Sequence, residues 1–230
     1  MKLIFTCFIL LTIVFSSHLS INPLNKDRSL NIKKQTEAKE LTVYYDSMCS
    51  DSLNFIKYSY RPFFNSKDLY AKFKVNLVPG SLMSNDMSNS FSCKHGYNEC
   101  VGNIYHLCAK NLFSNDLFNQ YVLCYFDFMR AYGYNIEETS NYCSGSIGLN
   151  FTELKKCADS DQGSNLAQNL LRTKQSFSFN FGHSPLAIID NNIPINEDEI
   201  FNNLVGFLCK LNGNKDNLSS CSSYYRSNKN

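Results

Sequence analysis

Hydrophobic and polar positions divide the first part of the chain into a strand, a helix and a second strand. Residues 41–45 form an apolar, β-rich run. Residues 50–64 repeat apolar side chains at close to helical spacing, which predicts a helix directly after that strand. From 71 to 79 the residues alternate, placing three apolar side chains on one face: Phe73, Val75 and Leu77. This order predicts a βαβ unit that ends at Pro79-Gly80.

The pattern changes from about 93 to 176, where apolar residues recur at helical spacing between cysteines, which predicts a disulfide-stapled helical insertion. The strand pattern then returns at 186–189 and 193–195 around a polar turn, and a helix is expected from about 197 to 211. The sequence therefore predicts the fold class α/β, as a thioredoxin-like βαβ…ββα domain that carries the insertion.

The N-terminus has the pattern of a signal peptide. Lys2 precedes a run of about 13 apolar residues, from Leu3 to Phe15, and small residues follow. Such a run is short for a membrane span, so we expect cleavage near residues 16–20, with a retained anchor as the alternative. No later run reaches about 18 apolar residues, which predicts a soluble mature protein of the secretory pathway with no transmembrane segment.

The cysteine count singles out one residue. Of ten cysteines, Cys7 lies in the predicted signal, which leaves nine. In an oxidising compartment cysteines pair, so an odd number leaves at least one over. Eight lie at residue 93 or beyond and can form four bridges among themselves, for which Cys209–Cys221 is the one pairing we expect. Cys49 stands apart as the candidate free thiol; an intermolecular disulfide is the alternative.

Composition and charge exclude other classes of function. Hydrophobic content of 43% and charged content of 18% are ordinary for a globular protein. A formal net charge of +2 gives no argument for a nucleic-acid partner. The triplets at Asn150 and Asn217 permit N-glycosylation, in keeping with secretion.

The position of Cys49 favours reactivity. It stands where the first strand gives way to a helix, and the amides at a helix start stabilise a thiolate. We expect this junction to expose the thiol; a buried, inert cysteine is the alternative. Pro185 comes just before the strand at 186–189, which is where thioredoxin-like domains hold a cis-proline opposite the reactive cysteine.

One stretch, CKHGYNECVGNIYHLCA at 93–109, combines cysteines with other residues at fixed spacing: Cys93, His95, Gly96, Glu99, Cys100, Asn103 and Cys108. It resembles the signature of the gamma-interferon-inducible lysosomal thiol reductase (GILT) family, with Lys94 where that signature has Gln. The likeness extends over about residues 41–221. It implies a glycosylated protein, secreted or lysosomal, that reduces disulfide-containing proteins at acid pH. In such reductases one cysteine of a Cys-x-x-Cys pair attacks and the second resolves the mixed disulfide.

The chain departs from that pattern at the resolving position, where the tetrapeptide reads Cys49-Ser50-Asp51-Ser52. A hydroxyl cannot displace a thiolate from a disulfide. Cys49 could therefore act with an external small thiol as reductant, trap partners covalently, or belong to a protein that binds without turnover. Ser52 could still hydrogen-bond the Cys49 thiolate. No bound cofactor is expected.

The remaining candidates have ordinary interpretations. His95 is expected to form structural hydrogen bonds, and His106 and His183 to be surface or core residues, although His183 is near the proline in sequence. The cysteines lack paired metal-ligand spacing, so no metal is expected. No papain-like signature surrounds Cys49. Partners are expected to be disulfide-containing protein substrates or a protein partner, and nothing in the sequence specifies an oligomeric state.

The sequence predicts four parts of the chain and a disulfide framework of eight cysteines. The parts of the chain are a signal peptide at 1–20, an arm at 21–40, a thioredoxin-like GILT-type domain at 41–213 with its insertion at about 93–176, and a polar tail at 214–230. The framework comprises Cys93, Cys100, Cys108, Cys124, Cys143, Cys157, Cys209 and Cys221.

Overall fold

The structure is a computed structural model that describes residues 40–80, 83–85, 90–177, 181, 184–189, 193–195, 197–211 and 218–227. The predicted signal peptide and the arm up to residue 39 lie outside these residues, as do His183 and Asn217. Glu40, placed at the end of the arm by the sequence, is instead the first residue of strand β1 (Glu40–Tyr45).

A four-stranded mixed sheet forms the centre of the domain, in the order β2-β1-β5-β6. Strand β2 (Lys74–Pro79) runs parallel to β1, and β5 (Leu186–Ile189) runs antiparallel to β1 on its other side. Strand β6 (Ile193–Pro194) pairs with β5 at the edge. This order and these directions are those of a thioredoxin-like domain, which confirms the fold predicted from the sequence.

The crossover between β1 and β2 is a run of consecutive helical segments, one of which is a π-helix. It consists of α1 (Ser50–Asn54), the π-helix η1 (Phe55–Tyr60), α2 (Arg61–Asn65) and α3 (Lys67–Lys72). Its apolar face is fully buried at Phe55, Ile56 and Tyr60, which explains the helical spacing in the sequence. Along β2, Val75 and Leu77 are buried while Lys74 is exposed, as the alternation predicted.

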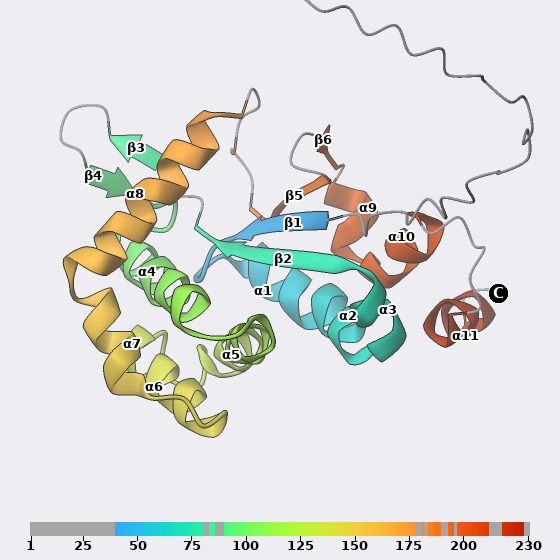
Figure 1. Ribbon diagram of the computed structural model, residues 1–230, viewed down its shortest axis with the longest axis horizontal. Coiled ribbons are helices and arrows are strands. Elements are labelled where there is room, and N and C mark those ends of the chain that lie inside the picture. The colour runs from blue at the N-terminus through green and yellow to red at the C-terminus, as the bar shows by residue number, and fades with distance from the viewer. Residues whose placement is uncertain are drawn as a thin grey trace, which may run out of the picture. The chain divides into compact units, whose positions relative to one another are not determined.

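Along the chain, a hairpin and five helices come between β2 and β5. The hairpin β3 (Met83–Asn85) and β4 (Ser90–Ser92) was not predicted. The helices are α4 (Tyr97–Leu112), α5 (Asn115–Phe128), α6 (Ile136–Ser146), α7 (Phe151–Ala158) and α8 (Asp161–Gln175). They form the predicted helical insertion and gather beside the end of the sheet at which β1 and β2 finish (Figure 1).

The C-terminal part differs from prediction in two places. The single helix expected from 197 to 211 is two helices, α9 (Glu197–Phe201) and α10 (Leu204–Leu211). The expected polar tail contains a further helix, α11 (Ser219–Ser227). Helix α11 packs on α10 through the Cys209–Cys221 disulfide, and Asp68 of α3 accepts hydrogen bonds from Ser219 and Ser220. Among the described residues, no helix is both long and apolar enough to cross a membrane.

Candidate functional site

Cys49 lies where β1 gives way to α1 and is the N-cap residue of that helix. Its carbonyl accepts from the N–H of Leu53 at 3.0 Å, so the thiol is held at the first turn. It is the free cysteine of the described part of the chain, but its side chain is only 4% exposed. The expectation of an exposed thiol was therefore wrong: the thiol is buried and donates to the carbonyl of Ser184, directly before Pro185, at 3.5 Å.

Ser52, three residues after Cys49, is fully buried. Its hydroxyl accepts from the N–H of Asp46 at 3.0 Å and shares a hydrogen bond with the hydroxyl of Ser184, also at 3.0 Å. The sequence suggested that Ser52 could hydrogen-bond Cys49; in the structure these two other groups are its partners. Ser52 thus ties the end of β1, the start of α1 and the loop before β5 together.

The peptide bond between Ser184 and Pro185 is cis, directly before β5. The Ser184 carbonyl faces the Cys49 thiol, so Pro185 and Cys49 belong to one site. The antiparallel pairing of β5 with β1, with Tyr44 opposite Leu186, brings these distant segments together. In this arrangement the Ser184 carbonyl contacts the buried sulfur that an incoming disulfide would have to reach.

Asn103 of α4 supports the loop that carries Cys49. Its side-chain oxygen accepts from the N–H of Ser47 at 2.8 Å, and its amide donates to the carboxylate of Asp46 at 3.0 Å. All three residues are fully buried. One amide therefore fixes two consecutive loop residues, because its oxygen accepts a hydrogen bond while its nitrogen donates one.

Glu99 supports the same loop from one turn earlier in α4. Its backbone carbonyl accepts from the Ser47 hydroxyl at 3.2 Å. Its carboxylate accepts from the N–H of His95 at 2.9 Å and pairs with the His95 ring nitrogen Nδ1 at 2.6 Å. Burial, and secondarily the charge of Asp46, raises the pKa of Glu99. His95 thus has the structural hydrogen bonding that the sequence suggested.

Neither Asp46 nor Glu99 was assigned a role from the sequence, although both lie in segments that carry the family resemblance. The signal that could have found them is the spacing within α4. Glu99 and Asn103 are four residues apart and so share one helix face. Gly102 lets α4 come close to the same loop, since a Cβ at that position would overlap the Ser47 hydroxyl. The signature residues of α4 therefore hold the Cys49 loop.

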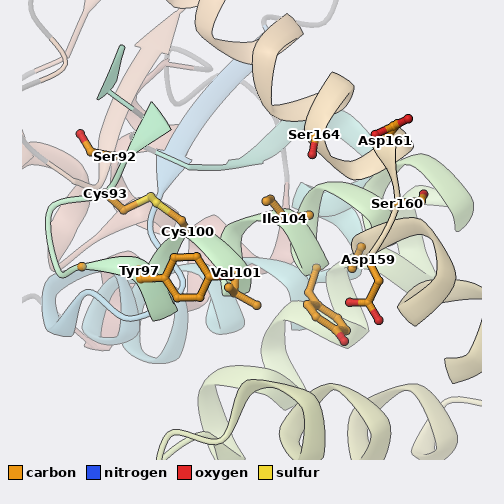
Figure 2. A pocket seen from close by; sticks show the side chains of 13 residues that line it. Ser92, Cys93, Tyr97, Cys100, Val101, Ile104, Asp159, Ser160, Asp161 and Ser164 are labelled. Atoms are coloured by element: carbon orange, nitrogen blue, oxygen red, sulfur yellow. A yellow bond between two sulfur atoms is a disulfide. The ribbon is translucent and has the colours of Figure 1, made fainter. Parts of the chain in front are cut away.

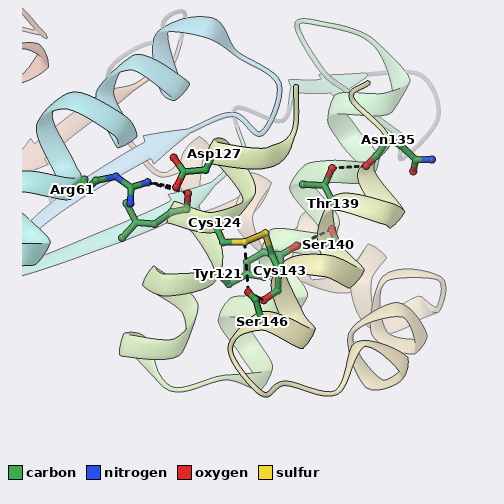
Figure 3. Close-up of a disulfide and its surroundings, with 10 residues drawn as sticks. Arg61, Tyr121, Cys124, Asp127, Asn135, Thr139, Ser140, Cys143 and Ser146 are labelled. Atoms are coloured by element: carbon green, nitrogen blue, oxygen red, sulfur yellow. Dashed lines mark hydrogen bonds and ion pairs between the residues drawn. A yellow bond between two sulfur atoms is a disulfide. The ribbon is translucent and has the colours of Figure 1, made fainter. Parts of the chain in front are cut away.

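The eight distal cysteines form four disulfides: Cys93–Cys100, Cys108–Cys157, Cys124–Cys143 and Cys209–Cys221. The last is the one pairing expected from the sequence. Figure 3 shows Cys124–Cys143 joining α5 to α6. Beside it the Tyr121 hydroxyl donates to Ser140 at 2.9 Å, and Arg61 of α2 pairs with Asp127 of α5 at 2.7 Å. These contacts staple the insertion internally and attach it to the crossover.

The other predicted residues lie apart from the thiol. Gly96 begins α4 with φ of 89°, a conformation that favours glycine. His106 is buried in the core, and its ring nitrogen Nδ1 shares a hydrogen bond with the Tyr45 hydroxyl at 2.8 Å. Burial lowers the pKa of His106 to about 3. Asn150 is exposed and caps α7. In the described ranges, no three His, Cys, Asp or Glu side chains gather as they would to hold a metal ion.

Comparisons with known proteins agree on one family. The family model described as Gamma interferon inducible lysosomal thiol reductase (GILT) matches residues 40–147. A gamma-interferon-inducible lysosomal thiol reductase-like protein of Anopheles gambiae is 32% identical over 138 residues, 54% of this chain and 56% of that protein. GILT-like protein 1 of Drosophila melanogaster is 26% identical over 137 residues, 54% of each chain.

The chain spans about half the length of these two curated relatives. A crystal structure described as that of a candidate protein disulfide isomerase from Nitrosomonas europaea aligns with a TM-score of 0.48 and 13% identity, over 67% of this chain and 85% of that one. The matched residues, 40–147, hold Cys49 and the whole α4 signature. Over these residues, the chain is similar to the gamma interferon inducible lysosomal thiol reductase family.

Proposed function

We propose that this protein is a thiol–disulfide oxidoreductase of the secretory pathway, lysosomal or extracellular, in which Cys49 attacks disulfides of substrate proteins. The observation that carries the proposal is the free Cys49 at the start of α1, whose thiol donates to the Ser184 carbonyl next to Pro185. The similarity to this family and the thioredoxin-like sheet support a thiol reductase role.

The reaction needs an external thiol, because Ser52 cannot resolve a mixed disulfide. The Cys49 thiolate attacks one sulfur of a substrate disulfide, forming a mixed disulfide and releasing the other substrate sulfur, which takes a proton. A small thiol then attacks the Cys49 sulfur and releases the reduced substrate. A second small thiol regenerates Cys49 and leaves as a small-molecule disulfide. Two external thiols are oxidised for each substrate disulfide reduced, with no bound cofactor.

A second candidate function is a GILT-like binding or effector protein that engages another protein without turnover, its activity reduced by the loss of the resolving cysteine. The observation that favours it is the closed site: the thiol is buried and donates to Ser184, and Ser52 and Ser184 are joined through their hydroxyls. In this function the scaffold persists while substrate disulfides are kept from the sulfur.

The experiment that separates the two is turnover of a disulfide-linked protein at about pH 4.5–5.5 with an excess of small thiol, comparing wild type with Cys49→Ser and Ser52→Cys. We expect wild type to exceed Cys49→Ser. Equal rates for those two proteins would exclude the oxidoreductase. Activity gained only in Ser52→Cys would show a competent scaffold whose natural form gave up turnover, and so support the binding function.

The location is part of the proposal. Four disulfides within the described residues fit an oxidising compartment. Asn150 is exposed at the start of α7, where a glycan would project into solvent. Expression in a secretory host, followed by glycosidase treatment of wild type and Asn150→Gln, tests both points. A product that stays in the cytosol, or that shows no glycan at Asn150 or Asn217, would contradict them.

A further inference from the structure

A groove of about 740 Å³ lies between α4 and the junction of α7 with α8, on the outer side of the signature helix. Figure 2 shows Tyr97 and Val101 of α4 toward one end of it and Asp159, Ser160, Asp161 and Ser164 toward the other. The Cys93–Cys100 disulfide lies at the Tyr97 end. Its size is within the range of ligand-binding clefts.

The two ends of the groove differ in chemistry. The first end is mostly apolar, with Ser92 as its polar side chain beside Val101, the disulfide and Tyr97. The Tyr97 side chain is 81% exposed, more than any other large hydrophobic side chain in the described part. An exposed aromatic side chain at the mouth of an apolar cleft is typical of protein-binding sites. Such a side chain would lose contact with water when a partner packed on it.

The second end is acidic. Asp159 is already paired with Lys155 at 3.0 Å, whereas no hydrogen bond or ion pair engages the carboxylate of Asp161 within the described residues. Two hydroxyls, of Ser160 and Ser164, lie beside it, and no basic side chain lines the groove among the residues described. This end is complementary to a cation and unfavourable to an anionic ligand.

The length of the groove indicates the form of the ligand. Its floor on α4 runs from Tyr97 to Tyr105, and at about 1.5 Å per helical residue this is about 12 Å. An extended peptide advances about 3.3 Å per residue, so about four residues cover that distance. An apolar side chain at one end and a Lys or Arg at the other then fall within one short segment.

We propose that this groove binds an extended segment of about four residues from a partner protein, with an apolar side chain against Tyr97 and Val101 and a Lys or Arg side chain at Asp161. The groove lies on the face of α4 away from the Cys49 loop, because Glu99 and Asn103 of the same helix hold that loop. Binding here does not depend on turnover at Cys49, so the proposal stands or falls separately from the proposed function.

The test uses acetylated and amidated heptapeptides in a Gly–Ser background, in which Arg follows Phe by two, three or four residues. Binding is measured by chemical-shift changes of ¹⁵N-labelled Cys49→Ser protein, so that thiol chemistry cannot contribute. We expect at least one peptide to shift amides of α4 and of 159–164. Asp161→Lys should weaken that peptide about fivefold, as for a partly exposed ion pair, and Tyr97→Ser by at least as much.

The charge-swapped peptide, with Glu in place of Arg, should bind Asp161→Lys better than it binds the parent protein. Glu153→Lys is the matched control, since Glu153 is also an exposed carboxyl in the first turn of a helix but lies outside the groove. The proposal is overturned if no peptide shifts these amides, if Arg and Glu peptides bind the parent equally, or if Glu153→Lys weakens binding as much as Asp161→Lys.

Discussion

At the scale of single residues, Ser52 has a structural role next to the free thiol. Its hydroxyl accepts from the N–H of Asp46 and shares a hydrogen bond with the hydroxyl of Ser184. Since Ser184 also accepts from Cys49, the same residue that cannot resolve a mixed disulfide keeps the thiol covered. Ser52 is therefore a positioning residue for the thiol.

Ser52→Ala should uncover Cys49. Removing one hydrogen bond worth about 0.5–1.5 kcal/mol favours opening of the Ser184 loop by about two- to tenfold, and Cys49 alkylation by iodoacetamide should accelerate accordingly. The buried N–H of Asp46 loses its acceptor, so the free energy of unfolding should fall by about 1–3 kcal/mol. The measurements are alkylation rate and urea unfolding.

Ser140→Ala is the matched control for that experiment. Ser140 is equally buried and accepts one hydrogen bond from Tyr121, but within the insertion. It should lose stability without any gain in the alkylation rate. If Ser52→Ala reacts no faster than wild type, the Ser52–Ser184 contact does not keep the thiol covered.

Glu99 is the second residue with a testable consequence. Burial raises its pKa in the folded protein, so between the ordinary carboxyl value and the raised one the folded state binds more protons than the unfolded state. The free energy of unfolding contributed by Glu99 therefore increases as the pH falls through that window. Glu99→Gln cannot titrate and should lose this increase.

The measurement is urea unfolding of wild type and Glu99→Gln at several values between about pH 7 and 4.5. Wild type should gain stability relative to the variant as the pH falls. Glu138→Gln, which removes an exposed carboxyl from the first turn of α6, shows the effect of losing a surface carboxyl. A difference between wild type and Glu99→Gln that is constant with pH would contradict the assignment.

At the scale of elements, the close approach of α4 to the Cys49 loop depends on Gly102. A Cβ there would overlap the Ser47 hydroxyl, lie 3.0 Å from the Ser47 Cβ and 3.3 Å from the Tyr125 hydroxyl. Gly102→Ala should therefore lower the free energy of unfolding by about 1–3 kcal/mol despite the better helix propensity of alanine, and should change the Cys49 alkylation rate.

Gly145→Ala provides the comparison, because Gly145 also lies in a helix but a Cβ there meets nothing within 4 Å. Alanine should stabilise that position by up to about 1 kcal/mol. Thermal or urea unfolding measures both variants. Equal effects at Gly102 and Gly145 would mean that α4 does not need a glycine to approach the loop.

Only part of the helices and strands could be predicted from the sequence. Periodicity predicted β1, β2, β5 and the helical insertion, because each buries a regular apolar pattern such as Phe73, Val75 and Leu77. It could not predict α11, whose residues are mostly polar. That helix is held by Cys221 and by Asp68, about 150 residues away in the chain, and such contacts leave no local pattern.

The candidate site could be predicted only in part, because its other contacts are also made between residues far apart in the chain. The strand–helix junction located Cys49, and the position before β5 located Pro185. The burial of the thiol could not be predicted, because it depends on a loop that returns 135 residues later to place the Ser184 carbonyl on it. The support of the Cys49 loop by Glu99 and Asn103 is likewise a contact across more than 50 residues.

At the scale of the whole molecule, the distribution of cysteines separates the disulfide-bonded sulfurs from the free one. Three of the four disulfides lie in the insertion or at the start of α4, and the fourth joins α10 to α11. The segment from β1 through α1 to β2 contains Cys49 and no other cysteine. Reducing the disulfides and modifying the reactive thiol are therefore separable experiments.

From Cys49 onward the chain has nine cysteines, eight of them paired, so iodoacetamide should label one cysteine in the non-reduced protein and nine after reduction. Labelling should be slow in the native state, since the thiol is 4% exposed, and fast in guanidinium chloride. Peptide mapping by mass spectrometry identifies the site. An intermolecular disulfide would instead give no labelled cysteine and a reducible dimer, and the burial of the sulfur opposes it. A disulfide-linked peptide containing Cys49 would contradict both the pairing and the proposed nucleophile, and a second labelled site would contradict the pairing.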